Sequence, residues 1–326
     1  MPPILEKYNQ RKLLIFSAFL ASISFVAFSY TNSIILSVLI LTLAQGSLHA
    51  NYSALIVLFK DSTRTVEEFT KDTGLLGSFN NLGWFVGPML GGLALGNYGF
   101  KGLFTLAGSL TLIGGLYVLL FPFKTMVKHR RSIDGDIKAN IRYYLSSKHL
   151  RISYLQKLGV ELWWGVIWTF IPIFMLKGGY SSATIGLFLS LTQLPLFLFE
   201  FKTVGFVAKY GFKKIFTYCY IGLTLICLLS FFTLSSQLAV VLALILAGSL
   251  ALSFLEPITD LFFFSRLSIL EEEKAYPTYS TAEPVGSMLA KIIPGISLAL
   301  FYDKAIFIIL GISLFFIATR AFAIRG

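Results

Sequence analysis

The stretch GLLGSFNNLGWFVGPMLGGLALG, residues 74–96, contains no charged side chain. As an α-helix it would be about 35 Å long. About 20 predominantly apolar residues are enough to cross the ~30 Å hydrocarbon core of a bilayer. The stretch is rich in glycine and contains a proline, and both residues are more frequent in transmembrane helices than in soluble ones. This stretch therefore predicts a transmembrane helix.

Comparable segments recur along the whole chain of 326 residues, which is 56% hydrophobic and 13% charged, with a mean hydropathy of +0.77. A soluble domain carries roughly 25% charged residues, so this composition excludes a soluble enzyme, a nucleic-acid-binding module and a disordered scaffold. The segments lack the alternation of barrel strands. The predicted fold is an all-α integral membrane protein with ten transmembrane helices, at about 13–31, 34–59, 74–96, 102–123, 152–176, 183–206, 214–234, 238–264, 281–301 and 304–323.

The positive charges predict the orientation of these spans. An even number of spans places both termini on one side, and the segments on that side hold 21 of the 27 Lys and Arg residues. The connections on the other side hold three: Lys101, Lys177 and Lys304. Because Lys and Arg concentrate on the cytoplasmic side, we expect a multi-pass protein of the plasma membrane with both termini in the cytoplasm.

The residues that build catalytic or metal centres are sparse. Cys219 and Cys227 are eight residues apart in one predicted helix, a separation of about 12 Å, which is too far for a disulfide. The three histidines lack ligand-like spacing, and the chain has no phosphate-binding loop motif. We expect no enzymatic activity, no metal, no cofactor and no nucleic-acid partner.

Two pairs of segments resemble each other. Residues 65–92 and 269–296 both run from an acidic loop into a helix with Gly and Pro, and 6–16 and 208–218 are both basic turns before a helix. The matches relate predicted helices one to four to helices seven to ten. Such repeats are typical of secondary transporters, whose substrate site lies at the repeat interface. Chance similarity among apolar segments is the alternative.

The longest polar stretch, residues 124–151, divides four predicted spans from six. Ile133, Ile137, Ile141 and Tyr144 recur in it at helical spacing among basic residues, which suits a short helix on the inner membrane surface. A solvated basic linker fits equally well. The predicted organisation is an N-terminal bundle of four spans, a cytoplasmic linker and a C-terminal bundle of six spans, at 1–123, 124–151 and 152–326.

At these residues the chain resembles the major facilitator superfamily, whose members are typically twelve-helix transporters made of two six-helix bundles joined by a cytoplasmic loop. The family's loop after its second helix is similar to residues 6–12, EKYNQRK. The resemblance therefore implies an incomplete fold of 4 + 6 helices, in which the first two family helices are absent. The family's fourth-helix motif resembles residues 42–46, TLAQG, without its arginine, which puts proton-coupled export through that arginine in doubt.

The strongest match is to the family's fifth-helix motif GxxxGPxxGG. Its fixed positions are Gly83, Gly87, Pro88, Gly91 and Gly92. The resemblance implies an export-type, antiporter-like member. Glycines four apart permit close helix packing in lipid, and the proline removes one helical hydrogen bond. We expect these residues to shape the pathway through packing rather than to contact the solute.

Charged residues inside a span mark pathways, because each costs at least ~2.5 kcal/mol to insert. Glu161 and Lys291 lie near the middle of two spans that the resemblance equates with neighbouring family helices. We predict that they form a switchable pair or bind a charged solute, with a static ion pair as the alternative. Other predicted pathway residues are Gln45, His49, Tyr52, Asn80, Asn81, Trp164 and Gln193. The alternative role for His49 is an interhelical hydrogen bond, and the alternative role for Trp164 is packing against neighbouring side chains. The predicted cytoplasmic gate comprises Glu6, Lys7, Arg11, Glu256 and Asp260, with membrane anchoring as the alternative for the last two.

These observations predict a secondary active transporter that moves a small solute by alternating access, of the efflux type. Its expected partners are the solute, a coupling proton and the lipid bilayer. The alternatives are an uptake permease for a sugar or organic acid, and a truncated membrane scaffold that does not transport. A membrane-embedded enzyme would need clustered ligands or a nucleophile–base pair, which the spans lack.

Overall fold

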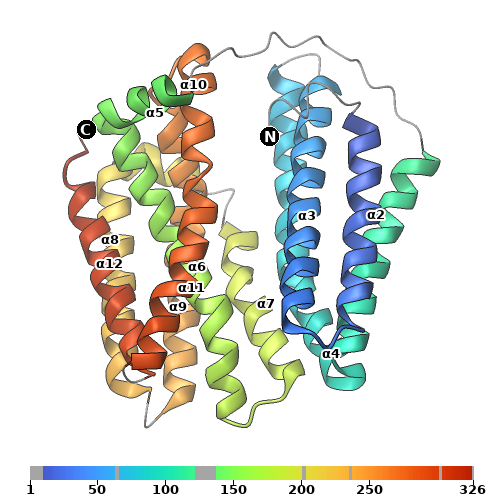
Figure 1. Cartoon of the computed structure of the whole chain (residues 1–326). Helices are drawn as coiled ribbons and strands as arrows, with labels where there is room; N and C mark the ends of the chain where they lie inside the picture. The colour runs from blue at the N-terminus through green and yellow to red at the C-terminus, as the bar shows by residue number, and fades with distance from the viewer. Residues whose placement is uncertain are drawn as a thin grey trace. The chain divides into compact units, whose positions relative to one another are not determined.

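The structure is a computed structural model that describes residues 10–62, 66–121, 137–199, 203–234, 237–300 and 303–324. Within these ranges the chain is helical and contains no strand (Figure 1). The predicted all-α class is confirmed. The helices are α2 (Gln10–Phe28), α3 (Ile34–Ser62), α4 (Val66–Leu120), α5 (Ile137–Ser146), α6 (Lys148–Lys177), α7 (Ser182–Phe199), α8 (Thr203–Thr233), α9 (Leu238–Phe264), α10 (Ile269–Tyr279), α11 (Ala282–Leu300) and α12 (Ala305–Ala321).

Seven helices in the described part of the chain are long and apolar enough to cross a membrane. They lie in α2, α3, α4, α6, α7, α8 and α9. The apolar stretch of α4, Phe79–Leu120, has 42 residues and would be about 63 Å long as one helix, which is twice the hydrocarbon thickness. It covers two predicted spans. The last two predicted spans correspond to α11 and to α12, a shorter apolar helix of 17 residues, so each predicted segment is occupied by a helix.

Two of the long helices are broken at a glycine. Gly99 in α4 has φ 65° and ψ −165°, and Gly211 in α8 has φ 75° and ψ 156°. Positive φ values favour glycine because it lacks a Cβ. The break at Gly99 separates the two spans of α4. The break at Gly211 falls in the basic turn that the sequence predicts at 208–218.

The described residues group into two compact units. The first comprises those of Met1–Asp134 together with Ser182–Leu187, and the second comprises those of Gly135–Ser181 and Phe188–Gly326. Residues 122–136, which include much of the predicted linker, lie outside the described ranges. The domain boundaries given by the sequence therefore stay a prediction.

In the first unit, α2 packs against both α3 and α4. A Cβ at Gly108 of α4 would lie only 2.8 Å from Cγ2 of Val26 on α2. The Ser22 hydroxyl donates a 2.8 Å hydrogen bond to the Gly108 carbonyl, and Asn51 Nδ2 of α3 donates a 2.9 Å bond to the Leu14 carbonyl. Small residues and interhelical hydrogen bonds are what hold helices together in lipid, so this packing suits a membrane protein.

In the second unit α6 is the central helix, because it packs against α9, α11 and α12. Two of its glycines make close approach possible. A Cβ at Gly159 would lie 2.7 Å from a ring carbon of Tyr220 on α8, and a Cβ at Gly165 would collide with the Cβ of Ala290 on α11. These contacts set the rotation of α6 about its axis, and with it the direction of its charged residues.

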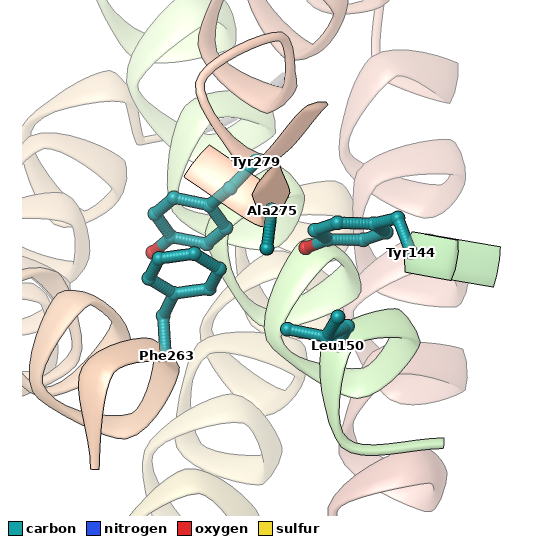
Figure 2. Close-up of a cluster of buried hydrophobic side chains, with 5 residues drawn as sticks. All are labelled: Tyr144, Leu150, Phe263, Ala275 and Tyr279. Atoms are coloured by element: carbon teal, nitrogen blue, oxygen red, sulfur yellow. The ribbon is translucent and has the colours of Figure 1, made fainter. Parts of the chain in front are cut away.

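Helices α5 and α10 pack together at one end of the second unit, which we call the α5/α10 end (Figure 1). The Tyr279 ring stacks on Phe263, with centroids 4.1 Å apart and planes at 12°. At the rim the Tyr143 hydroxyl donates a 3.1 Å hydrogen bond to Glu271 Oε1. Figure 2 shows the buried cluster that joins four helices here, made of Tyr144, Leu150, Phe263, Ala275 and Tyr279.

Candidate functional site

Charged side chains gather inside the second unit between α6 and α9. Lys157 Nζ lies 3.9 Å from Glu161 Oε1 on the same helix and 3.4 Å from Asp260 Oδ1 on α9. Trp164 Nε1 donates a 2.9 Å hydrogen bond to Glu256 Oε2. Residues three and four apart share a helix face, so each helix presents its members together. We call these five residues the α6/α9 polar cluster.

The two ends of this cluster differ in exposure. The side chains of Lys157 and Glu161 are each 16% exposed, whereas that of Asp260 is 48% exposed. Helix α11 covers Glu161 closely, because a Cβ at Gly286 would lie 2.5 Å from the Glu161 Cβ. Charges interact more strongly where water is excluded. Glu161 is therefore the carboxylate that depends most on Lys157 for compensation.

One oxygen of the cluster connects it to the α5/α10 end. Asp260 Oδ1 faces Lys157 and also accepts a 2.7 Å hydrogen bond from the Tyr279 hydroxyl of α10. Burial, and next the negative charge of Asp260, raise the pKa of Tyr279 above its ordinary value. Tyr279 therefore keeps its proton and donates to Asp260 at physiological pH.

The cluster contains three carboxyl groups and one ammonium group. Glu283, in the first turn of α11, also acts electrostatically on Lys157 and Glu161. Carboxylates accept hydrogen bonds and cations but donate none, so this arrangement suits a proton, a cationic group or the hydroxyl groups of a solute. No group of three side chains suited to a metal ion occurs among the residues that the structure describes.

The structure brings together four residues that the sequence predicts separately: Glu161, Trp164, Glu256 and Asp260. Lys157 is not among the site residues predicted from the sequence. It lies only a few residues inside a predicted span, where a long lysine side chain can reach the membrane surface. The signal that would have found it is its spacing of four residues from Glu161.

The predicted ion pair between Glu161 and Lys291 is not formed in this structure. Lys157 occupies the position beside Glu161, and Lys291 is exposed. The reason is the rotation of α11, which turns Gly286 and Ala290 toward α6. Lys291 follows Ala290 directly, so it points about 100° away around the helix. A role for Lys291 in the pathway stays a prediction.

The pathway residues predicted in the first unit share an exposed face of α3. Gln45, His49 and Tyr52 are all exposed, and Tyr52 is 51% exposed. In α4 Asn80 is exposed and Asn81 is half-buried, whereas Gln193 in α7 is buried. Their access to a solute stays a prediction.

Close packing involves only one end of the glycine motif. A Cβ at Gly83 or Gly87 would meet nothing within 4 Å, and one at Gly91 would make an ordinary contact of 3.4 Å. A Cβ at Gly92 would lie 2.9 Å from the Gly186 Cα, in the part of α7 that groups with the first unit. The packing role is therefore concentrated at Gly92.

The predicted gate at the N-terminal basic turn is described only at Arg11, because Glu6 and Lys7 lie outside the described residues. Arg11 Nη2 donates hydrogen bonds of 3.2 and 2.9 Å to the carbonyls of Val118 and Leu119. Cations favour the carbonyl end of a helix, so Arg11 caps the end of α4. A gating role for this turn stays a prediction.

Comparison with known proteins agrees with this architecture. Residues 1–156 match the family model described as Major Facilitator Superfamily. The chain also superposes on the nucleoside transporter NupG with a TM-score of 0.75 at 13% identity, covering 97% of this chain and 83% of that one. Residues 1–156 belong to the major facilitator superfamily, and the whole chain has that family's fold. No curated protein sequence matches the chain.

Structures of a second protein with this fold also match. The fucose:proton symporter FucP of E. coli matches with a TM-score of 0.65 at 15% identity, covering 100% of this chain and 86% of that one. FucP in its outward conformation matches with a TM-score of 0.64 at 16% identity, covering 99% and 85%. The major facilitator fold and the apolar helices make the chain a multi-pass membrane protein. The export subtype and the absence of two family helices stay predictions.

Proposed function

We propose that this major facilitator protein is a secondary active transporter that moves a small polar solute by alternating access. The observation that carries the proposal is the α6/α9 polar cluster, which places three carboxyl groups, a lysine and an indole between two membrane-spanning helices. Charges at such positions mark ion or substrate pathways by default. A nucleoside transporter and a fucose:proton symporter share the fold, and we extend transport to this chain.

The shared lysine suggests how a proton and a solute would be coupled. Lys157 lies between two carboxylates, at 3.9 Å from Glu161 and 3.4 Å from Asp260. A proton or a solute hydroxyl that neutralises or occupies one carboxylate leaves the lysine to interact with the other. The cluster would then have two charge arrangements, and a bistable element of this kind is what alternating access requires.

We infer that the α5/α10 end faces the cytoplasm of a plasma-membrane protein whose two termini are also cytoplasmic. The support is the strong bias of Lys and Arg toward this side of the predicted spans. In this orientation the Tyr279–Asp260 hydrogen bond lies at the inner side of the cluster. It would help to close the inner gate, to which we assign Glu256 and Asp260.

The direction we favour is uptake of a hydroxylated solute with a proton. Carboxylate oxygens accept hydrogen bonds from hydroxyl groups, and the half-buried indole of Trp164 can pack against the apolar face of a sugar or nucleoside. Export of an amphiphilic solute is the second candidate. It is favoured by the motif at residues 83–92, which resembles that of antiporter-like family members.

The test is transport by the purified chain in liposomes. Labelled L-fucose, uridine and an organic acid would be offered with and without an inward proton gradient, while an internal dye reports pH. We expect one solute class to accumulate with the gradient and to acidify the lumen. Efflux of a preloaded solute, driven by protons that enter down the inward gradient, would select the second candidate. Failure of a folded protein to move any solute in either direction would refute transport.

Matched variants assign the coupling to the cluster. Glu161→Gln and Asp260→Asn each remove a carboxylate that faces Lys157, so we expect gradient-driven accumulation to fall at least tenfold. Asp303→Asn removes a carboxylate from an exposed pair with Lys177 and should transport at the wild-type rate. Equal losses in all three variants would show that the cluster has no special role.

A further inference from the structure

A histidine joins the first turn of α6 to the last turn of α9. His149 is the second residue of α6 and precedes residue 152, where the predicted span begins. Its Nε2 lies 3.4 Å from the carbonyl oxygen of Phe263, and its ring meets that of Phe262 edge to face, with centroids 4.5 Å apart. Histidine is the side chain whose ordinary pKa places its change of charge near physiological pH.

The contact with Phe263 completes the hydrogen bonding at the end of α9. The last four carbonyls of a helix have no partner within it. Three of the four in α9 accept hydrogen bonds from residues that follow the helix, and they belong to Leu261, Phe262 and Phe264. The fourth carbonyl, that of Phe263, faces His149. Because a carbonyl only accepts, a neutral imidazole with its proton on Nε2 is sufficient to make this bond.

A second proton on His149 is poorly accommodated in the packed structure. The side chain is half-buried, and it lies at the N-terminal end of α6, where the helix dipole disfavours a cation. Lys148 and Arg151 on α6 and Arg266 beyond the end of α9 are also cationic. Burial lowers the pKa of His149 below its ordinary value of 6.5, and Arg266 lowers it too, against the opposite effect of the Phe263 carbonyl.

The neighbouring titratable groups of α5 and α10 are neutral or engaged elsewhere. Tyr144 and Tyr279 belong to the buried cluster next to His149, and burial raises the pKa of both hydroxyls, so both stay neutral. The carboxylate of Glu271 on α10 accepts a hydrogen bond from Tyr143. The imidazolium form of His149 therefore lacks compensation from these side chains.

We propose that His149 is a pH-sensitive switch, which fastens α6 to the end of α9 when neutral and releases it when protonated. The released histidine binds a proton near pH 6.5, whereas the fastened one does so only at lower pH. The joint is therefore complete above about pH 6.5 and weakens as the pH falls below that value.

The switch has a consequence for the pathway, which rests on the proposed function. Phe263 also stacks on Tyr279, and the Tyr279 hydroxyl bonds Asp260 of the α6/α9 polar cluster. Release of the end of α9 removes the support for this stack. Acidification of the compartment that the α5/α10 end faces should therefore loosen the inner gate.

Hydrogen exchange of the purified full chain in nanodiscs tests the switch without any solute. Protection factors of the amides in the last turn of α9, corrected for the intrinsic pH dependence of exchange, would be compared at about pH 7.5 and about pH 5.5. The lower value is one unit below 6.5, so a single histidine can lower protection by up to about tenfold. We expect a fall of several-fold in the wild type.

Three variants identify the group responsible. His149→Gln keeps a donor for the Phe263 carbonyl but does not titrate, and His149→Phe keeps the ring contact with Phe262, so neither should show the fall. His49→Gln removes an exposed histidine of α3 and should keep it. Protection that rises on acidification, or an equal fall in both His149 variants, would overturn the proposal. The wild-type fall in a protein that moves no solute would support the switch and refute only the proposed function.

Discussion

Replacing Lys157 with glutamine should destabilise the protein far more than the same change at Lys177, although Lys177 forms the shorter ion pair. Lys177 Nζ lies 2.7 Å from Asp303 Oδ2, but these side chains are 58% and 45% exposed. Lys157 lies 3.9 Å from Glu161, and both side chains are 16% exposed. The two variants therefore test whether burial or distance determines the strength of an ion pair here.

The expected magnitudes follow from this exposure. Exposed ion pairs contribute about 0–1 kcal/mol, because water screens them and both side chains lose freedom. Removing one partner of a buried pair costs about 3–5 kcal/mol, because the remaining charge stays in a poorly solvated place. At roughly 2 °C per kcal/mol for a large chain, Lys157→Gln should lower the melting temperature by about 6–10 °C and Lys177→Gln by no more than about 2 °C.

The assay is thermal unfolding of the purified variants in nanodiscs of one lipid composition, at a fixed heating rate because membrane proteins often unfold irreversibly. A double variant, Lys157→Gln/Glu161→Gln, identifies the cause. If the unpaired Glu161 carboxylate is responsible, neutralising it should recover most of the lost melting temperature. A double variant no more stable than Lys157→Gln alone, or equal losses at Lys157 and Lys177, would refute the reasoning.

Three further changes test the packing around the cluster. Gly159→Ala should lower the melting temperature, because its Cβ would lie 2.7 Å from the ring of buried Tyr220 and such overpacking costs about 1–3 kcal/mol. Its control is Gly222→Ala on α8, whose Cβ would meet nothing within 4 Å and which should leave the melting temperature unchanged. Tyr279→Phe keeps the aromatic stack with Phe263 but loses the hydrogen bond to Asp260. Because a hydrogen bond to a charged group contributes about 1.5–3 kcal/mol, hydrogen exchange of the α10 amides should become about tenfold faster or more. Hydrogen bonds from Ser268, the N-cap of α10, and next from Tyr143 of α5 lower the pKa of Glu271 below its ordinary value of 4.5. A carboxyl group whose pKa is lowered by folding stabilises the folded state above pH 4.5. This stabilisation is lost as the pH falls through the pKa of the folded state. Protection factors of the α10 amides, which are corrected for the intrinsic pH dependence of exchange, should therefore fall on acidification below pH 4.5, and Glu271→Gln should abolish this fall.

Each of these tests has a contradicting outcome. Gly159→Ala and Gly222→Ala with the same melting temperature would contradict the close packing of α6 against α8. Unchanged exchange in Tyr279→Phe would show that the stack with Phe263 alone holds α10. A pH dependence that survives in Glu271→Gln would assign it to another carboxyl group.

The membrane helices could be predicted from the sequence because each needs only local information. About 20 apolar residues suffice to cross the hydrocarbon core whatever lies beside them, and a helix occupies each predicted segment. The break at Gly211 was also locally encoded, since a glycine in a basic turn accepts the positive φ observed there.

The candidate site could be predicted only in part. Glu161, Glu256 and Asp260 stand out because charge inside a span is costly wherever it lies. The importance of Lys157 did not stand out, because a lysine near the end of a span is common and usually reaches the headgroups. Its role depends on Asp260, which is far away in the sequence and 3.4 Å away in space.

The sequence by itself determined the class of the protein, the positions of its helices and the charges that those helices bury, because hydropathy and backbone preference act over one or two turns. Only the tertiary structure decided which charges meet. Glu161 is paired with Lys157 and not with Lys291, because Gly286 and Ala290 are the residues of α11 that fit against α6. That choice is made by steric fit between helices, which sets their rotation and is not encoded in either helix alone.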